Sequence, residues 1–402
     1  MISSESSDEE LPLRQRTHAT PLKRNTTDTG KKSNKKNKVR SEATDKKTSD
    51  RNTISSDVKI ARKALCDGKI DADLNTSVQR GRMQTVTIAL PGSIIENAQT
   101  KELKTYLAGQ IARAAVIYQV HEIVVYDDHL GQKSSESGPQ ASETIQRDAY
   151  DCHVFLMRIL QYLETPQYLR KQLFPKHTDL SCAGLLNPLD IPHHVRSTEQ
   201  SVYREGVVSD RMLREKEGSY VYVGLQKEVR VDKRIHPGIR VTVKLDQTTK
   251  HSKKLLGTLV SPLEPRQKTG IYWGYNCRFA SSLRHVWQES PFENGYDLKI
   301  GTSERGNKST NDSTFSLPAF KHALIVFGGV AGIEECVGSD ETIALSGEES
   351  HKLFDMWVNT CPSQGSRTIR TEEAVLISLS ALTPHLRTSA ESPETVLGAL
   401  GV

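Results

Sequence analysis

The sequence predicts an α/β domain that is interrupted by a small β-barrel and preceded by a basic tail. Three observations support this prediction: a strand–helix–strand pattern over residues 85–128, a group of short β-type runs within 203–276, and a strand–loop–helix pattern over 354–382. Strands that alternate with helices indicate a parallel sheet. Short strands that are separated by Gly and Pro indicate a barrel.

The first 80 residues are rich in Ser, Thr, Asp, Lys and Asn. Residues 21–63 hold fourteen Lys and Arg against five Asp and Glu, a net charge of +9, whereas the whole chain of 402 residues has +5. Such a segment cannot bury enough apolar surface to offset the entropy of ordering, so we expect residues 1–80 to form a disordered basic tail.

Within this tail, Lys23-Arg24 and the lysine-rich run 31–38 are typical of a two-part nuclear localisation signal. They predict an import receptor as a partner and a location in the nucleus or nucleolus. A generic solvated tail is the alternative interpretation, and tethering to RNA is compatible with both.

Cysteine usage and hydropathy exclude several classes of protein. The six cysteines, at 66, 152, 182, 277, 336 and 361, form no C-x-x-C pair and show no zinc-ligand spacing with histidines. We therefore expect no metal site and a reducing compartment. The polar N-terminus does not resemble a signal peptide. No run approaches the ~20 apolar residues of a membrane helix, so no membrane partner is expected.

The first part of the α/β domain is placed at residues 81–202. Thr85–Leu90 is strand-like and is ended by Pro91-Gly92-Ser93. Apolar residues at three- and four-residue spacing from Leu103 to Tyr118 predict a helix, and Glu122–Asp128 predicts a buried strand. A second helical zone covers Ala149–Leu173, and the Pro-rich run 184–194 excludes a regular element there.

Residues 203–276 are predicted to form an inserted OB-like barrel. Its five expected strands are Tyr220–Leu225, Glu228–Val231, Ile239–Leu245, Leu255–Val260 and Gly270–Tyr275. Basic residues lie beside aromatic ones in this segment, a combination that binds single-stranded nucleic acid. The RNA-binding candidates are Tyr220, Tyr222, Lys227, Arg230, Lys233, Arg234, Arg240, Lys244, Lys250, Lys253 and Lys254. A solvated basic face is the alternative.

The α/β pattern returns at residues 277–390, and residues 391–402 are expected to be frayed. Phe279–Trp287 is predicted to be helical. The expected strands are Tyr296–Ser303, Ala323–Phe327 and Phe354–Val358, followed by a last helix at Glu372–Leu382.

Three strand ends in this part are rich in small residues: Gly301–Gly306, Phe327–Gly332 and Asn359–Ser366. Ligands bind outside the carboxyl ends of strands in open α/β sheets, so the three loops predict one convergent pocket, with an ordinary turn as the alternative for each. None of them matches the dinucleotide-binding or Walker A pattern. An enzyme that uses another adenosine-containing ligand remains a rival.

The run Thr368-Ile369-Arg370-Thr371-Glu372-Glu373-Ala374 closely resembles a C-terminal segment of the SPOUT methyltransferases that modify ribosomal RNA. The resemblance extends over residues 84–385. It is closest to a eukaryotic and archaeal subfamily with an OB-like insertion, which includes a human member associated with the spindle and kinetochore. Further matching runs are Gly184–Asp190, Tyr203–Gly206, Tyr272–Tyr275, Gly295–Leu298, Ile300–Gly306 and Val358–Leu379.

This resemblance implies a trefoil knot, S-adenosylmethionine (SAM) as cofactor and a homodimer. The cofactor-binding residues that it implies are Phe327, Gly328, Gly329, Gly332, Asn359, Thr360, Cys361, Pro362, Gly365, Ser366, Thr368, Ile369 and Thr371. We interpret Cys361 as part of the cofactor wall and not as a covalent nucleophile. The catalytic candidates are Arg305, Arg367, Arg370 and Glu372. The arginines could equally hold RNA phosphate, and Glu372 could be a helix cap only.

The expected function is SAM-dependent methylation of a base in large-subunit rRNA, with uridine N3 favoured by the Arg370-Thr371-Glu372 match. A non-catalytic RNA-binding adaptor that retains the fold is the alternative. By the same resemblance, the adaptor would associate with the mitotic spindle, the centrosome or the kinetochore.

Overall fold

The computed structural model describes residues 83–129, 151–211, 218–249 and 254–388. The chain divides into two units, Met1–Asn75 and Thr76–Val402, and every described residue lies in the second. The predicted basic tail therefore lies outside the described residues, as do Lys250, Lys253 and residues 391–402. No helix among the described residues is long and apolar enough to cross a membrane.

The core of the fold is a seven-stranded sheet in which every neighbouring pair is parallel. The strand order is β10 (Lys308–Ser309), β12 (Met356–Asn359), β9 (Leu298–Thr302), β11 (His322–Val326), β1 (Thr85–Pro91), β2 (Glu122–Tyr126) and β8 (Asn276–Ala280). Because β12, β9 and β11 are parallel neighbours, their carboxyl ends meet at one stretch of the sheet edge.

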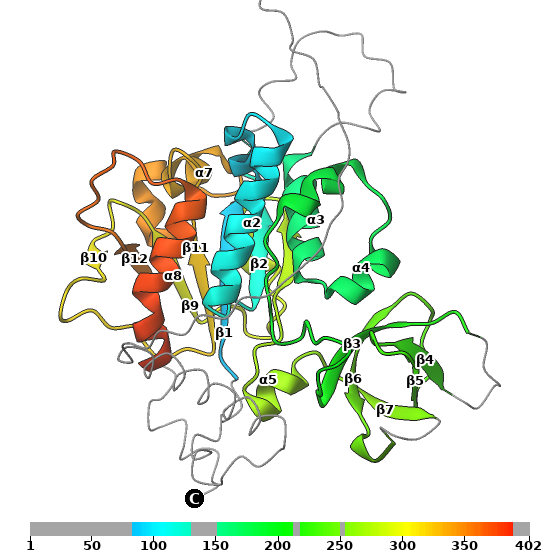
Figure 1. Cartoon of the computed structure of the whole chain (residues 1–402). Coiled ribbons are helices and arrows are strands. Elements are labelled where there is room, and N and C mark those ends of the chain that lie inside the picture. Colours follow the sequence, from blue (N-terminus) through cyan, green and yellow to red (C-terminus); the bar gives the residue numbers. More distant parts are fainter. Residues whose placement is uncertain (1–82, 130–150, 212–217, 250–253, 389–402) are drawn as a thin grey trace, which may run out of the picture. The chain divides into compact units, whose positions relative to one another are not determined.

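Helices cover both faces of this sheet. The helices α2 (Lys101–Ile117), α3 (Cys152–Glu164) and α8 (Thr371–Thr388) share one apolar core, and α2 and α8 lie side by side (Figure 1). The opposite face packs against α6 (Leu283–Gln288), α7 (Ile333–Ser339) and the 3-10 helix η7 (Gly347–Leu353). Successive residues of β11 serve the two cores in turn, since side chains alternate along a strand.

A closed five-stranded barrel is inserted between α/β elements. Its strands occur in the order β3 (Tyr203–Val208), β4 (Ser219–Tyr222), β5 (Val229–Val231), β7 (Leu255–Val260) and β6 (Arg240–Leu245). Only the β5–β7 pair is parallel. Small valine side chains fill the interior, among them Val221, Val229 and Val243, each with no exposed surface.

The remaining described elements are short helices within or between these two parts. They are the 3-10 helix η2 (Gly92–Asn97), α4 (Gln167–Leu173), the 3-10 helices η5 (Thr178–Leu185) and η6 (Gln247–Thr249), and α5 (Glu264–Thr269). Helix α4 contacts barrel strand β3. Pro91 directly precedes η2, and Pro175 lies three residues before η5.

Two sequence predictions were wrong. Gly270–Tyr275 forms no strand, because Tyr272 and Tyr275 turn their rings into the α/β core and donate their hydroxyls to the carbonyls of Val120 and Leu160. The fifth barrel strand is β3 instead. The predicted helix at Phe279–Trp287 begins only at Leu283, since the preceding residues form β8.

The barrel and the α/β domain are joined by a buried polar junction. Arg240 of β6 donates two hydrogen bonds to Glu164 at the end of α3, at 2.6 and 3.0 Å, and a third to Glu205 of β3 at 2.8 Å. Trp273 also donates to Glu205, at 2.6 Å. The fully buried His193 lies 3.0 Å from Glu164. The Arg240 guanidinium, which the sequence predicted to contact RNA, thus binds two carboxylates of the fold.

Replacing Arg240 by Met would leave the carboxylates of Glu164 and Glu205 buried without their cation. Removing one partner of a buried ion pair costs about 3 kcal/mol or more. We expect Arg240→Met to lower the free energy of unfolding by about that amount in urea titrations. Lys268→Met is the control, because Lys268 pairs with Glu264 at the surface, where ion pairs contribute little. Equal stability of both variants would contradict the assignment of Arg240 as the cation of a buried ion pair.

The same variant gives a pH signature. Burial acts to raise the pKa of Glu164, but Arg240 and His193 outweigh it and hold the pKa at about 2, below its ordinary 4.5. A depressed carboxyl pKa stabilises the folded state above the unfolded-state pKa, and this stabilisation is lost as the pH falls toward 2. The stability difference between wild type and Arg240→Met should therefore shrink as the pH falls from 4.5 toward 2. A stability difference between the two proteins that stays constant from pH 4.5 to pH 2 would contradict the role of Glu164.

Candidate functional site

A pocket of about 460 Å³ lies where β9, β11 and β12 end, a volume in the range of ligand sites. Loops after all three strands and the first turns of α8 form its wall. The lining residues are Thr302, Ser303, Glu304, Arg305, Phe327, Gly328, Gly329, Val330, Ala331, Gly332, Glu334, Glu335, Asn359, Thr360, Cys361, Gln364, Arg367, Thr368, Ile369, Thr371, Ala374, Ile377 and Ser378.

The loop after β12 is fixed by side chains that bond to backbone groups. Asn359 accepts a hydrogen bond from the Cys361 backbone N–H at 3.0 Å, which shapes the turn in the manner typical of asparagine. Its amide nitrogen donates to the Glu304 carbonyl at 2.8 Å. Thr360 bonds to Ser378 of α8 at 2.8 Å. This loop is thereby tied both to the β9 loop and to the last helix.

The loop after β11 is held from two sides. Tyr126 of β2 donates its hydroxyl to the Phe327 carbonyl at 2.7 Å, and Thr371 of α8 donates to the Gly328 carbonyl at 3.0 Å. A Cβ on Gly328 would overlap the backbone of Gly332, whose φ of +90° suits glycine. The loop therefore folds back on itself only with glycine at these positions.

The β9 loop passes directly over the end of β12. A Cβ on Gly306 would overlap the backbone nitrogen of Asn359. The following short strand, β10, pairs with β12 on the side away from β9. The chain thus leaves β9, crosses β12 and returns to β11, so β12 is flanked on both sides by this one segment.

The charges on the wall are mixed. Glu304, Glu334 and Glu335 line the pocket together with two arginines, Arg305 and Arg367, and the described lining includes no lysine. Neither arginine has an ion-pair partner among the described residues. Three carboxylates disfavour a polyphosphate ligand, whereas a cationic sulfonium suits them. Apolar lining from Phe327 and Ile369 suits a flat heterocycle.

Most of the residues predicted for the cofactor line this pocket. The exceptions are Pro362, Gly365 and Ser366, which lie outside the lining. Of the catalytic candidates, Arg305 and Arg367 line the pocket, and Arg370 and Glu372 do not. The Arg370 backbone N–H donates to Glu373, and Glu372 is buried.

Sequence reasoning missed wall residues outside the three predicted loops, chiefly Glu334 and Ser378. Glu334 comes two residues after Gly332, at the start of α7. This position after a glycine-rich strand end was the available signal. Ser378 could not have been found in this way, because only the packing of α8 brings it to Thr360.

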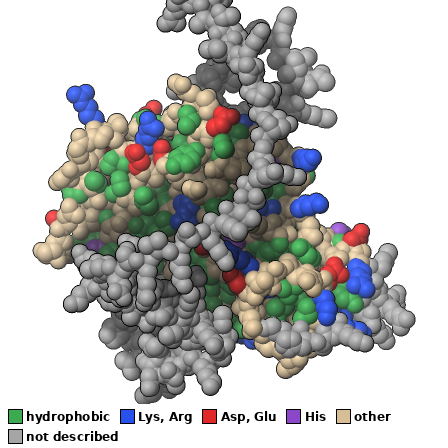
Figure 2. Space-filling model, viewed as in Figure 1, with side chains coloured by type: hydrophobic (Ala, Val, Ile, Leu, Met, Phe, Trp, Pro, Cys, Tyr) green, Lys and Arg blue, Asp and Glu red, His purple; other side chains and the backbone are tan. Residues whose placement is uncertain are grey.

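The predicted RNA-binding residues lie on the barrel, where Lys and Arg side chains gather in Figure 2. Val221 and Val229 point inward, so the alternation along β4 and β5 directs Tyr220, Tyr222 and Arg230 outward. Arg211 stacks on the Tyr220 ring at 4.5 Å. The side chains of Lys227, Lys233, Arg234, Lys244 and Lys254 are exposed.

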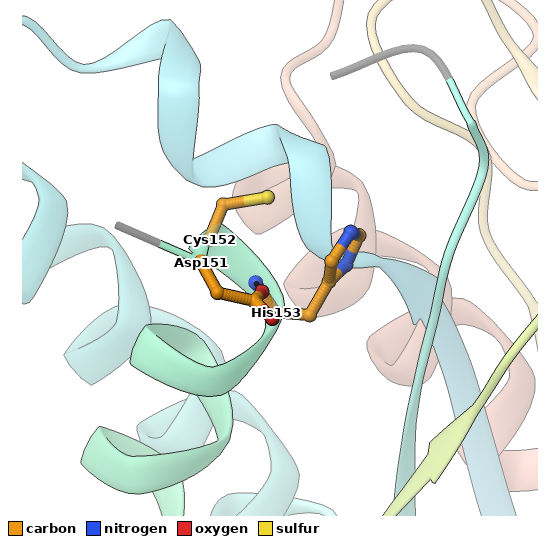
Figure 3. Close-up of side chains that lie close together, drawn as sticks. All are labelled: Asp151, Cys152 and His153. Carbon is orange, nitrogen blue, oxygen red and sulfur yellow. Dashed lines mark hydrogen bonds between the residues drawn. The ribbon is translucent and has the colours of Figure 1, made fainter. Parts of the chain in front are cut away.

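Asp151, Cys152 and His153 offer ligand atoms within 4.8 Å of one another (Figure 3). Their donor atoms have other roles in the fold, however. Asp151 caps α3 by accepting from the backbone N–H groups of His153 and Val154, Cys152 is buried in the core, and His153 lies 3.5 Å from Asp127. This arrangement is that of a helix start and not of an open metal site.

The fold and the site define the class of protein. It is an α/β protein with a parallel sheet, a ligand pocket at the carboxyl edge of that sheet and an inserted barrel. The family model described as "Putative RNA methyltransferase" matches residues 85–382. The chain belongs to this family of RNA methyltransferases, as the resemblance predicted.

Among its relatives are proteins named "28S rRNA (uridine-N(3))-methyltransferase". The Homo sapiens protein is 54% identical over 76% of this chain and 80% of its own length. The Mus musculus protein is 52% identical over 79% and 81%. The Drosophila melanogaster protein is 48% identical over 75% and 62%.

Proposed function

We propose that this protein transfers a methyl group from SAM to N3 of a uridine in large-subunit rRNA. The observation that supports this most strongly is the pocket at the ends of β9, β11 and β12, in a chain of the RNA methyltransferase family. The names of relatives at 48–54% identity support the choice of uridine N3.

The residues of the pocket fit SAM. Backbone groups of the loops 327–332 and 359–371 would hold the adenine and ribose, and the carboxylates of Glu304 and Glu335 suit a positive sulfonium. The absence of lysine on the described wall fits a cofactor without phosphates. Bound SAM supplies a methyl group that is already electrophilic.

The remaining task falls to residues of the chain. Phe327 and Ile369 supply apolar wall and help to exclude water. The uridine must lose its N3 proton, which leaves negative charge on the base. Arg305 and Arg367 are placed on the wall to meet that charge.

We assign the barrel the role of an OB-like RNA-binding module. Its strand order, with the parallel β5–β7 pair closing the barrel, supports this. OB folds bind nucleic acid on their second and third strands, which correspond here to β4 and β5. Tyr222 and Arg230 lie outward on that face, and Tyr222 offers a ring for a base to stack on.

We also propose that the backbone is threaded as a trefoil knot around β12 and that the protein is a homodimer. The crossing of Gly306 over Asn359 and the placement of β12 between β9 and β10 support the threading. The dimer is proposed from the family resemblance.

Import into the nucleus through the basic tail, with an import receptor as partner, is a proposal from sequence alone, since that tail lies outside the described residues. Association with the spindle, centrosome or kinetochore has the same standing, because it comes only from the resemblance.

Mass mapping of nucleosides tests the reaction. Full-length protein with SAM and protein-free large-subunit rRNA should produce 3-methyluridine at one position, and Arg305→Ala should slow this about 100-fold if its cation meets the developing charge. Arg196→Ala, an exposed arginine on a loop, is the control. SAM binding without transfer to any nucleoside would favour the adaptor function. No binding at ~1 mM SAM would contradict the pocket assignment.

Gly306→Ala tests the closeness of the loops. The added methyl group would force the β9 loop away from Asn359 and open the pocket wall, so calorimetry should show SAM binding weakened by at least about tenfold. Gly338→Ala is the matched control, because a Cβ there meets no atom within 4 Å. Unchanged SAM affinity in Gly306→Ala would show that this close approach does not shape the site.

A further inference from the structure

Methylation at N3 requires a group that accepts the N3 proton, and the pocket wall holds three carboxylates, Glu304, Glu334 and Glu335. Glu304 and Glu335 are exposed, and no described contact orients their side chains. Glu334 is half-buried. Two further acids near the site are buried: Asp128 and Glu372 lie outside the pocket lining.

The Glu334 carboxylate is held in place by the β9 loop. Ser303 donates its hydroxyl to Oε1 of Glu334 at 2.9 Å, and the same hydroxyl accepts from the Arg305 backbone N–H at 3.1 Å. This chain of two hydrogen bonds fixes the position of one carboxylate oxygen. It also links that oxygen to the backbone of Arg305, another residue of the pocket wall.

The second oxygen of Glu334, Oε2, lies beside Gly332 of the pocket wall. Oε2 would lie only 2.5 Å from a Cβ on Gly332, whose φ is +90°. Glycine at this position therefore leaves room for the carboxylate beside the pocket. No protein hydrogen bond to Oε2 is found within the described residues, whereas Oε1 is taken by Ser303.

We infer that Glu334 accepts the N3 proton of the target uridine, an assignment that rests on the proposed function. In this step N3 forms its bond to the methyl carbon, the bond from that carbon to sulfur breaks, and its electron pair stays on sulfur. The N3 proton passes to Oε2 of Glu334. Ser303 is a positioning residue, and Arg305 meets the charge that develops on the base before the methyl group arrives.

The Glu334→Gln variant tests this role, because it keeps the size of the side chain and an oxygen that can accept from Ser303. A positioned general base contributes about 10²–10⁴-fold, so the single-turnover rate of uridine methylation should fall at least about 100-fold. SAM affinity by calorimetry should change less than about threefold. Glu341→Gln, on an exposed carboxylate outside the pocket lining, should keep the wild-type rate.

A second variant separates proton transfer from a structural role. In Glu334→Ala the side chain leaves a gap, and added formate should restore part of the rate, whereas chloride at equal ionic strength should not. An unchanged rate in Glu334→Gln, or no response of Glu334→Ala to formate, would overturn the inference.

Binding data distinguish the remaining alternative. If Glu334 served the sulfonium instead, Glu334→Gln would weaken binding of SAM but not of the neutral-sulfur product S-adenosylhomocysteine, and the inference would be wrong. Failure of the proposed function looks different: wild-type protein would then bind SAM and still methylate no uridine.

Discussion

The site depends on one constraint: three loops at the edge of a parallel sheet must come within backbone contact of each other. β12, β9 and β11 are neighbours, so their carboxyl ends start close together. Gly306 lets the β9 loop approach the backbone of Asn359, and Gly328 lets the β11 loop fold back on its own residue Gly332; a Cβ would prevent either contact. Bonds from Asn359, Thr360 and Thr371 then hold the loops in place. The pocket is thus preorganised by backbone, with few side chains left to do chemistry.

A second constraint concerns the barrel. Its attachment does not rely on an apolar interface alone, because Arg240 donates three of its hydrogen bonds to an acid of the barrel and an acid of α3. Buried ion pairs are often no more stabilising than apolar contacts, but they demand a defined geometry. This junction fixes the barrel at the end of α3.

Local patterns predicted much of the fold. The spacing of apolar residues predicted α2 and the three strands that end at the pocket. Runs of small residues predicted the loops that follow these strands. The tyrosines at 272 and 275 misled the strand assignment, because β-type residues there are used for long-range core contacts that no local pattern records. The β8–α6 boundary was missed for a similar reason, since Phe279 suits both a strand and a helix.

The pocket wall was predictable where strand ends rich in small residues or the family motif marked it. Ten of the thirteen cofactor residues line the pocket, as do Arg305 and Arg367. Glu334 was not predicted because its role depends on Ser303, which lies 31 positions away in the sequence. Arg240 was predicted to bind RNA, because a basic residue beside aromatic ones gives the same local pattern whether its partner is RNA phosphate or a buried carboxylate.

The most direct test is a crystal structure of the full chain with S-adenosylhomocysteine. We predict that the adenine and ribose lie between the loops 327–332 and 359–371, with the sulfur facing the wall that carries Arg305 and Glu334. Ligand density at any other place, or a chain path in which β12 is not enclosed by the segment between β9 and β11, would contradict the account.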